Sequence, residues 1–140
     1  MSTQNICGGS VYTATPVAPI ELFPASVERV FNRLACIAND DDLYEPGEER
    51  PLADTIAWAR RVLLKIVPGY YLRTAEIDVF RGEIHVSWER DSRRVVAFLP
   101  SPDKLKIYVE WTKLTGETEH FLRSVDDPRA INPVLKWLYT

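Results

Sequence analysis

The sequence has little of what most catalytic and metal-binding sites are made of. Its 140 residues include two cysteines, Cys7 and Cys36, and two histidines, His85 and His120. Two cysteines do not make a disulfide framework, and their neighbours do not form a CxxC metal or redox motif. A metal site needs three or more convergent ligands, and neither histidine has them nearby in the sequence. We therefore expect no metal and no other cofactor.

Long apolar runs and an excess of basic charge are missing as well. No run approaches the roughly 20 apolar residues of a membrane-spanning helix, and no basic region followed by an apolar stretch marks a secretory signal. The 17 Lys and Arg against 20 Asp and Glu give a net charge of −3, which argues against a protein that coats nucleic acid. Gly8-Gly9 lacks the lysine of a phosphate-binding loop. We expect a soluble, cytoplasmic protein without nucleotide hydrolysis.

What is present is typical of one globular domain. Hydrophobic residues make up 46% and charged residues 26%, which are ordinary values for a folded chain of this length. Residues 1–20 are rich in Ser, Thr, Gly and Pro and show no helical period. We predict that they form a leader, either loosely packed or ordered by a partner, and that residues 21–140 form a single α+β domain.

Two segments in the first half carry apolar residues at helical spacing. The first begins at Ser26, whose side chain suits a helix cap, and ends at Asn39. The second runs from about Leu52 to Val67 and is ended by Pro68-Gly69. Near the C-terminus, Asp127-Pro128 and Asn132-Pro133 are helix-start signals that predict a short final helix.

Between these helices the period of the apolar residues is two, which is typical of strands. The strand-like segments are residues 71–75, 76–80, 82–89, 94–99, 104–111 and 118–123. Short turns connect them, so we predict an antiparallel meander. The predicted fold is α+β, with two N-terminal helices packed on a curled, four-stranded antiparallel meander and a short C-terminal helix. All four tryptophans lie on predicted inward faces and are expected in the core.

The most unusual segment is the acidic loop, residues 39–50, with the sequence NDDDLYEPGEER. Like charges resist packing together, so the loop must be solvated. Its aspartates do not have the spacing of a calcium-binding loop. The loop either solubilises the protein or attracts a basic partner. The candidate partner-binding residues are Asp40, Asp41, Asp42, Tyr44, Glu45, Glu48 and Glu49.

Two other sets of residues support different hypotheses. An arginine-rich set near aromatic residues suggests nucleic-acid binding if its members face the same way, and ordinary charged surface if they do not. These residues are Arg60, Arg61, Arg90, Arg93 and Arg94. His85 shares a strand face with Glu83 and Ser87, which would suit a small hydrolase. Residues two apart on a strand stand nearly 7 Å apart and point in parallel, so we expect no direct hydrogen bond between a nucleophile and a base here, and a solvated polar face.

The middle of the chain resembles a group of small bacterial α+β proteins without an established activity. The resemblance covers roughly residues 50–112 and consists of a helix opened by Pro51, a turn at Pro68 and the hairpin segment GEIHVSWE at residues 82–89. Members of that group often carry a Gly-Trp-Asp-Gly-Tyr-like segment before the helix proline, where this chain has its acidic loop. The resemblance implies a partner-binding role of the kind seen in phage-defence or toxin–antitoxin systems, and it transfers no site residue.

These observations favour a non-catalytic bacterial binding protein, inhibitor-like or antitoxin-like. We expect it to engage another protein with a basic surface through the acidic loop and exposed aromatic residues. A nucleic-acid-binding regulator that uses the arginine-rich set is the alternative, and a small hydrolase is the second alternative.

Overall fold

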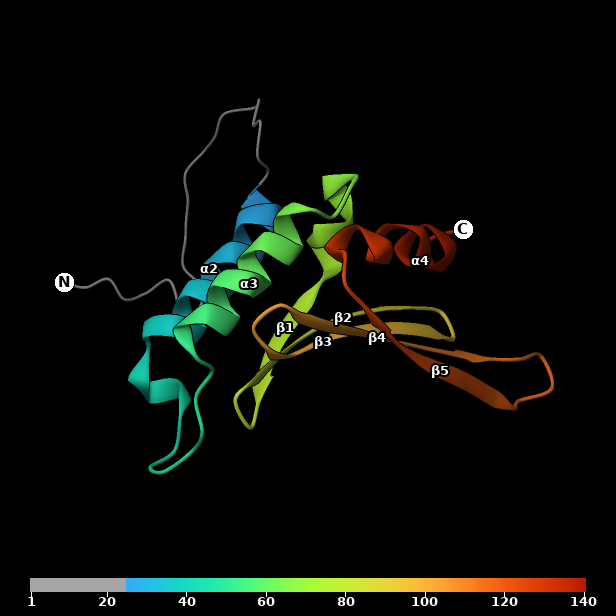
Figure 1. The fold of residues 1–140 in the computed structure, drawn as a ribbon. Helices are drawn as coiled ribbons and strands as arrows, with labels where there is room; N and C mark the ends of the chain where they lie inside the picture. The colour runs from blue at the N-terminus through green and yellow to red at the C-terminus, as the bar shows by residue number, and fades with distance from the viewer. Residues whose placement is uncertain (1–24) are drawn as a thin grey trace.

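A computed structural model describes residues 25–140, in which three helices pack on an antiparallel sheet (Figure 1). The α-helices are α2 (Ala25–Asn39), α3 (Ala53–Leu64) and α4 (Ile131–Leu138). The strands are β1 (Glu76–Phe80), β2 (Glu83–Arg90), β3 (Arg93–Ser101), β4 (Lys104–Thr112) and β5 (Thr118–Val125). Three short 3-10 helices are η1 (Asp41–Leu43), η2 (Gly69–Thr74) and η3 (Pro128–Ala130). The α+β prediction is confirmed, and the leader predicted at residues 1–20 lies outside the described residues.

Within residues 25–140 the sheet has five strands instead of the predicted four, in the order β1-β2-β3-β4-β5. The extra strand comes from residues 71–80, whose sequence predicted strand-like segments at 71–75 and 76–80. Only β1 at its end is a strand, and the part before it is the 3-10 helix η2. Tyr71 and Leu72 are adjacent and both buried, an arrangement that a helical turn allows and an alternating strand does not.

The first two helices follow their apolar spacing. Val27, Val30 and Leu34 bury one face of α2, as residues three and four apart do on a helix. Cys36 is also buried there, but it is not a free thiol. Both helices lie on the same face of the sheet, as Figure 1 shows.

The helix α3 ends at Leu64, three residues before the predicted end. The side chain of Asn132 in α4 holds the residues that follow α3. It accepts a hydrogen bond from the Val67 N–H and donates one to the Lys65 carbonyl, each at 3.1 Å. Asn132 therefore closes the end of α3 and does not cap its own helix. Asp127 does act as a cap, since its carboxylate accepts from the Arg129 N–H of η3 at 3.0 Å.

Tight turns set the register of the meander. Arg90 pairs with Arg93, so Asp91-Ser92 forms a two-residue turn in place of the expected four-residue connection. Asp91 has φ 56° and Gly82, in the β1–β2 turn, has φ 80°. Such positive values are required in the hairpin turns that match the strand twist, and Asp and Gly tolerate them best.

The core lies between the helices and one face of the sheet. Alternate residues of β2, β3 and β4 point into it, among them Ile84, Trp88 and Leu99. Trp58 is also buried, but Trp111 and Trp137 are only partly buried, so the prediction that all four tryptophans lie in the core is wrong for these two. No helix within residues 25–140 is long and apolar enough to cross a membrane.

Candidate functional site

The acidic loop connects α2 to α3 and is held in place by its own polar groups. The Tyr44 hydroxyl donates to the Ile37 carbonyl of α2 at 2.7 Å. The Asp40 carboxylate accepts from the Asp42 N–H at 3.0 Å, and the Glu48 carboxylate accepts from the Glu45 N–H at 2.8 Å. Side-chain bonds of this kind stabilise turns. The loop therefore presents its charges from an ordered backbone.

Tyr44 is half-buried, and it is not the fully exposed interface anchor that its position in a charged loop suggested. Burial is the main cause that raises the pKa of its hydroxyl above the ordinary value. The guanidinium of Arg50 lies 4.6 Å from the ring centroid, within the range of a cation–π contact. The ring thus fixes the position of the loop.

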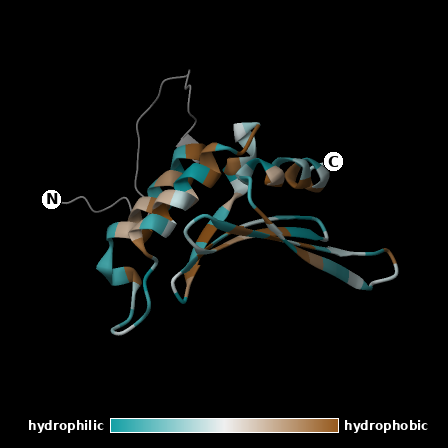
Figure 2. Cartoon of the chain, viewed as in Figure 1, coloured by the Kyte–Doolittle hydropathy of each residue, from teal (hydrophilic) through white to brown (hydrophobic). Residues whose placement is uncertain are grey.

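Most carboxylates of the loop form no ion pair with another described residue. Of the six carboxylates, only Asp41 forms an ion pair within the described part of the chain, with Arg50 at 2.7 Å. Its hydrogen bond is the main cause that raises the pKa of Arg50. Figure 2 shows hydrophilic residues gathered at this end of the molecule. The remaining carboxylates leave a net negative surface.

The acidic loop also reaches the sheet. The side chain of Glu49 lies against Gly82, where a Cβ atom would stand 2.9 Å from a carboxylate oxygen. Gly82 follows β1, whose last residue, Phe80, is 55% exposed. The carboxylates of the loop and an exposed aromatic ring are therefore parts of one surface region.

The arginine-rich set does not form one basic surface. Arg93 and Arg94 are consecutive on β3 and so point to opposite faces of the sheet. Each member has an internal contact: Arg60 with the Phe31 ring, Arg61 with Asp103, Arg90 with Asp91, Arg93 with the Trp137 carbonyl and Arg94 with Glu89. The nucleic-acid hypothesis requires these residues to face the same way, and the pleat of β3 separates Arg93 from Arg94.

The sequence predicted that His85 lies on a solvated polar face, but its side chain has a protein partner. Its Nε2 lies 3.0 Å from Oε1 of Glu83, because a glutamate side chain is long enough to span alternate positions of a strand. His85 bonds Glu83 and not Ser87, so the arrangement contains no activated hydroxyl. Within residues 25–140, no three side chains of His, Cys, Asp or Glu converge as a metal site.

A row of rings crosses the face of the sheet opposite the helices. It runs through Phe80, His85, Phe98, Tyr108 and His120, one from each strand, with centroids 4.6 to 6.5 Å apart. Aromatic rows of this kind stack nucleic-acid bases when basic residues accompany them. Here the same face carries Glu76, Asp78, Glu83, Glu89 and Glu110 against Arg94, Lys104 and Lys106. The charge balance does not favour a polyanion.

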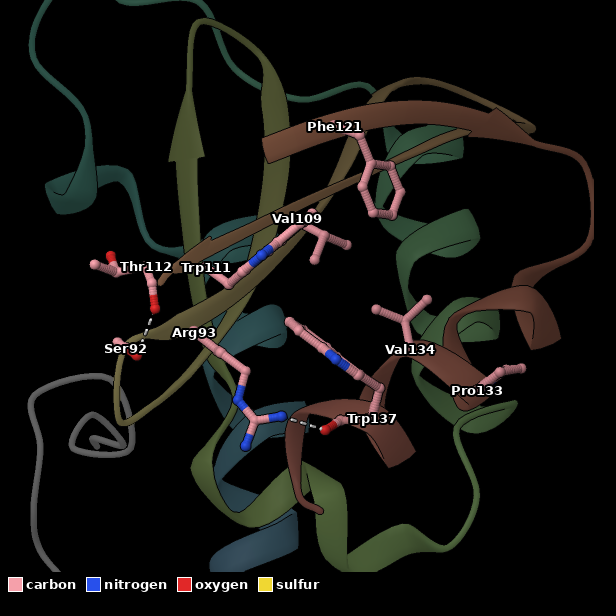
Figure 3. A pocket seen from close by; sticks show the side chains of 9 residues that line it. All are labelled: Ser92, Arg93, Val109, Trp111, Thr112, Phe121, Pro133, Val134 and Trp137. Carbon is pink, nitrogen blue, oxygen red and sulfur yellow. Dashed lines mark hydrogen bonds between the residues drawn. The ribbon is translucent and has the colours of Figure 1, made fainter. Parts of the chain in front are cut away.

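An apolar pocket of about 660 Å³ lies between the sheet and α4 (Figure 3). The rings of Trp111 and Trp137 meet edge to face at 6.1 Å, and Phe121 of β5 meets Trp111 at 6.2 Å. Arg93 lies over the Trp137 ring at 5.0 Å and donates to its carbonyl at 2.8 Å. We call this the tryptophan pocket. The pocket was not predictable from the sequence, because it depends on how α4 packs on the sheet.

Comparison with known proteins does not assign this chain to a family. No family model matches the chain, and no curated protein or solved structure is significantly similar to it.

Proposed function

We propose that this chain is a non-catalytic, cytoplasmic binding protein, inhibitor-like or antitoxin-like, that engages a protein with a basic surface. The observation that carries the proposal is the acidic loop, an ordered segment whose carboxylates, except Asp41, have no cation partner within residues 25–140. A basic partner would supply the missing counter-charges.

The ordered backbone of the acidic loop lowers the entropy cost of binding a partner. Fixing a mobile loop on association costs free energy, and this cost is lower when the loop is already held in its bound shape. The bonds of Asp40, Tyr44 and Glu48 hold the backbone before any partner arrives. Concentrated negative charge also increases the association rate with a basic surface.

The exposed ring of Phe80 supplies the apolar component of the proposed interface. Protein interfaces combine a charged rim with a few aromatic anchors at the centre. Leu43 is 36% exposed within the loop, and Phe80 lies next to the Gly82 turn that Glu49 contacts. The partner would place apolar residues on Phe80 and basic residues on the loop.

The test neutralises carboxylates that do not hold the loop together. The loop variant is Asp42→Asn, Glu45→Gln and Glu49→Gln, which retains Asp40, Asp41 and Glu48. The matched control removes the same charge elsewhere, at exposed residues without ion pairs in the described structure: Glu28→Gln, Glu117→Gln and Asp126→Asn.

Both variants and the wild type are used to capture partners from a lysate of the native host. The dissociation constant of any captured protein is then measured at low and high salt. We expect the loop variant to bind the partner about tenfold more weakly and to lose most of the salt dependence of binding. The reason is that it lacks three carboxylates that would pair with basic residues of the partner. Equal affinity of the loop variant and the control would remove the loop from the interface. Capture of nucleic acid alone would favour the regulator hypothesis.

A further inference from the structure

Within residues 25–140, the strand β5 is an edge of the sheet with no strand beyond it. All of its eight residues except Val125 are exposed, and Phe121 and Leu122 are 41% and 58% exposed. The strand contains no proline, and its register against β4 has no bulge. Proteins usually protect such edges, because the unpaired N–H and C=O groups are a template for another strand.

The direction of each backbone group in β5 follows from the hairpin. The Lys113 N–H donates to the Glu117 carbonyl at 2.7 Å, and the groups that face the neighbouring strand alternate along an antiparallel pair. With Val109 opposite Phe121, the N–H and C=O of Phe121 point toward β4. Those of His120 and Leu122 therefore point away from the sheet, where a further strand would bind them.

The side chains of β5 carry opposite charges at equal distances on either side of Phe121. Glu119 precedes it by two residues and Arg123 follows it by two, so all three lie on the face of the sheet that carries the helices. We propose that a second copy of this chain pairs with β5 in an antiparallel manner, with a two-fold axis at Phe121. Phe121 then faces Phe121 of the second copy, and Glu119 faces Arg123 of the second copy on both sides of the axis.

The charges needed for this pairing are accessible. Arg123 has no carboxylate partner within residues 25–140, and its guanidinium lies 5.9 Å from the centroid of the Phe121 ring. Glu119 binds Lys113 through Oε2 at 2.7 Å, and its side chain is 45% exposed. A carboxylate accepts several hydrogen bonds, so Glu119 retains acceptor capacity for an arginine.

Other registers are less favourable. A shift of the second strand by one residue places side chains of the two faces opposite each other, which the pleat does not allow. A shift by two residues places Phe121 opposite a charged side chain, either Glu119 or Arg123 of the second copy. Only the register centred on Phe121 matches opposite charges on both sides of the paired aromatic rings.

The pairing brings the two tryptophan pockets together. Phe121 lines this pocket, so Phe121 of the second copy would extend its wall across the two-fold axis and cover the exposed part of the ring. The two sheets would become one continuous sheet with the helices of both copies on one face. This inference does not depend on the acidic loop and goes beyond the proposed function.

The first test measures the mass of the full chain by analytical ultracentrifugation over a wide concentration series. We expect a reversible dimer for the wild type. Glu119→Arg and Arg123→Glu each place like charges opposite each other at two positions, and each should weaken dimerisation by at least about tenfold. An equimolar mixture of the two variants should form a dimer again, because arginine then faces glutamate at both positions.

A second variant tests the backbone. Leu122→Pro removes an N–H that points away from the sheet, so it leaves the bonds to β4 intact and removes a donor needed by the second copy. Leu122→Ala is the matched control and should dimerise like the wild type. Circular dichroism and thermal unfolding confirm that each variant is folded.

Three results would overturn the inference: a wild type that stays monomeric, a dimer that is insensitive to both charge reversals, and a mixture that stays monomeric. None of these results bears on the acidic loop, because Glu119, Leu122 and Arg123 lie outside it. Failure of the proposed function would instead appear in the partner affinity of the loop variant, with the dimer unchanged.

Discussion

The two edge strands of the sheet, β1 and β5, differ in whether side chains from a helix bind their outward backbone groups. Beside β1, the helix α2 supplies two arginines to main-chain carbonyls. Arg33 donates to the outward carbonyl of Ile77 in β1 at 3.2 Å, and Arg29 donates to the carbonyls of Arg73 and Ala75, just before the strand, at 2.9 and 2.8 Å. At β5, no described element supplies such donors. One edge is closed by side chains from a helix, and the other is open.

This difference shows that the exposure of the backbone groups of an edge strand depends on the elements packed beside the strand, and not on the strand sequence alone. Both strands carry charged residues, but β1 has five residues and lies beside α2, whereas β5 has eight residues and extends past the helices (Figure 1). Long side chains from a helix satisfy an edge locally and prevent further pairing. An edge without them is available for binding.

The largest expected effect compares the inward side chains of the two edge strands. Ile77 in β1 is buried, and Phe121 in β5 is 41% exposed. Ile77→Ala should lower the free energy of unfolding by about 2–4 kcal/mol, because it leaves a cavity in the core. Phe121→Ala should cost about 1 kcal/mol or less, since much of its ring is already in water. Urea unfolding of the two variants at low protein concentration measures both values, and equal losses would mean that β5 is packed as tightly as β1.

The next effect concerns the arginines that close β1. Arg29→Gln together with Arg33→Gln removes the charged donors from three carbonyls and should cost about 1–2 kcal/mol, reduced from the value for buried bonds by solvent exposure. Arg123→Gln on β5 is the control and should cost less than about 0.5 kcal/mol in the monomer. Chemical denaturation checks both, and a double variant as stable as the control would show that the arginines do not stabilise the edge.

Periodicity predicted most of the elements in this comparison. The helix from Ser26 to Asn39, the final strand and the short C-terminal helix appear close to the predicted positions, because one buried face imposes a repeat on the sequence. The bonds that Arg29 and Arg33 of α2 make beside β1 were not predictable, because they depend on how the helix lies across the strand.

Other features needed tertiary information. Tyr71 was assigned to a strand, but its carbonyl accepts from the Trp88 indole at 2.9 Å within a 3-10 turn. Trp111 and Trp137 follow the inward pattern of their elements, yet they line a pocket because α4 does not fill the space beside β5. The acidic loop was visible in the sequence from composition alone, whereas the bond between Tyr44 and Ile37 that anchors it was not.

A smaller effect, which leaves the monomer's stability unchanged, is the exchange of backbone amides along β5. The amides of Glu119 and Phe121 point toward β4 and should be protected, whereas those of His120 and Leu122 should exchange rapidly at low protein concentration. Hydrogen exchange measured by NMR gives the rate at each residue. At high concentration the amides of His120 and Leu122 should become protected as the second copy binds. Uniform exchange along the strand would contradict the alternation.

The smallest expected effect separates the two ends of the sheet by pH. Beyond β5, Asp127 accepts from the N–H of Arg129 at 3.0 Å, and this bond is the main cause that lowers the pKa of its carboxyl, followed by the Arg129 side chain. A lowered pKa means that the bond stabilises the protein above the unfolded-state pKa, about 4, and that this contribution is lost as the pH falls through the folded-state value. Asp127→Asn should therefore be less stable than the wild type at neutral pH, and the difference should shrink on acidification. The bonds of Arg29 and Arg33 beside β1 go to main-chain carbonyls and not to a carboxylate, so they should not be lost in the same way. NMR titration of Asp127 together with unfolding of both variants from pH 7 to pH 3 checks this, and a stability difference independent of pH would assign the effect of the substitution to packing.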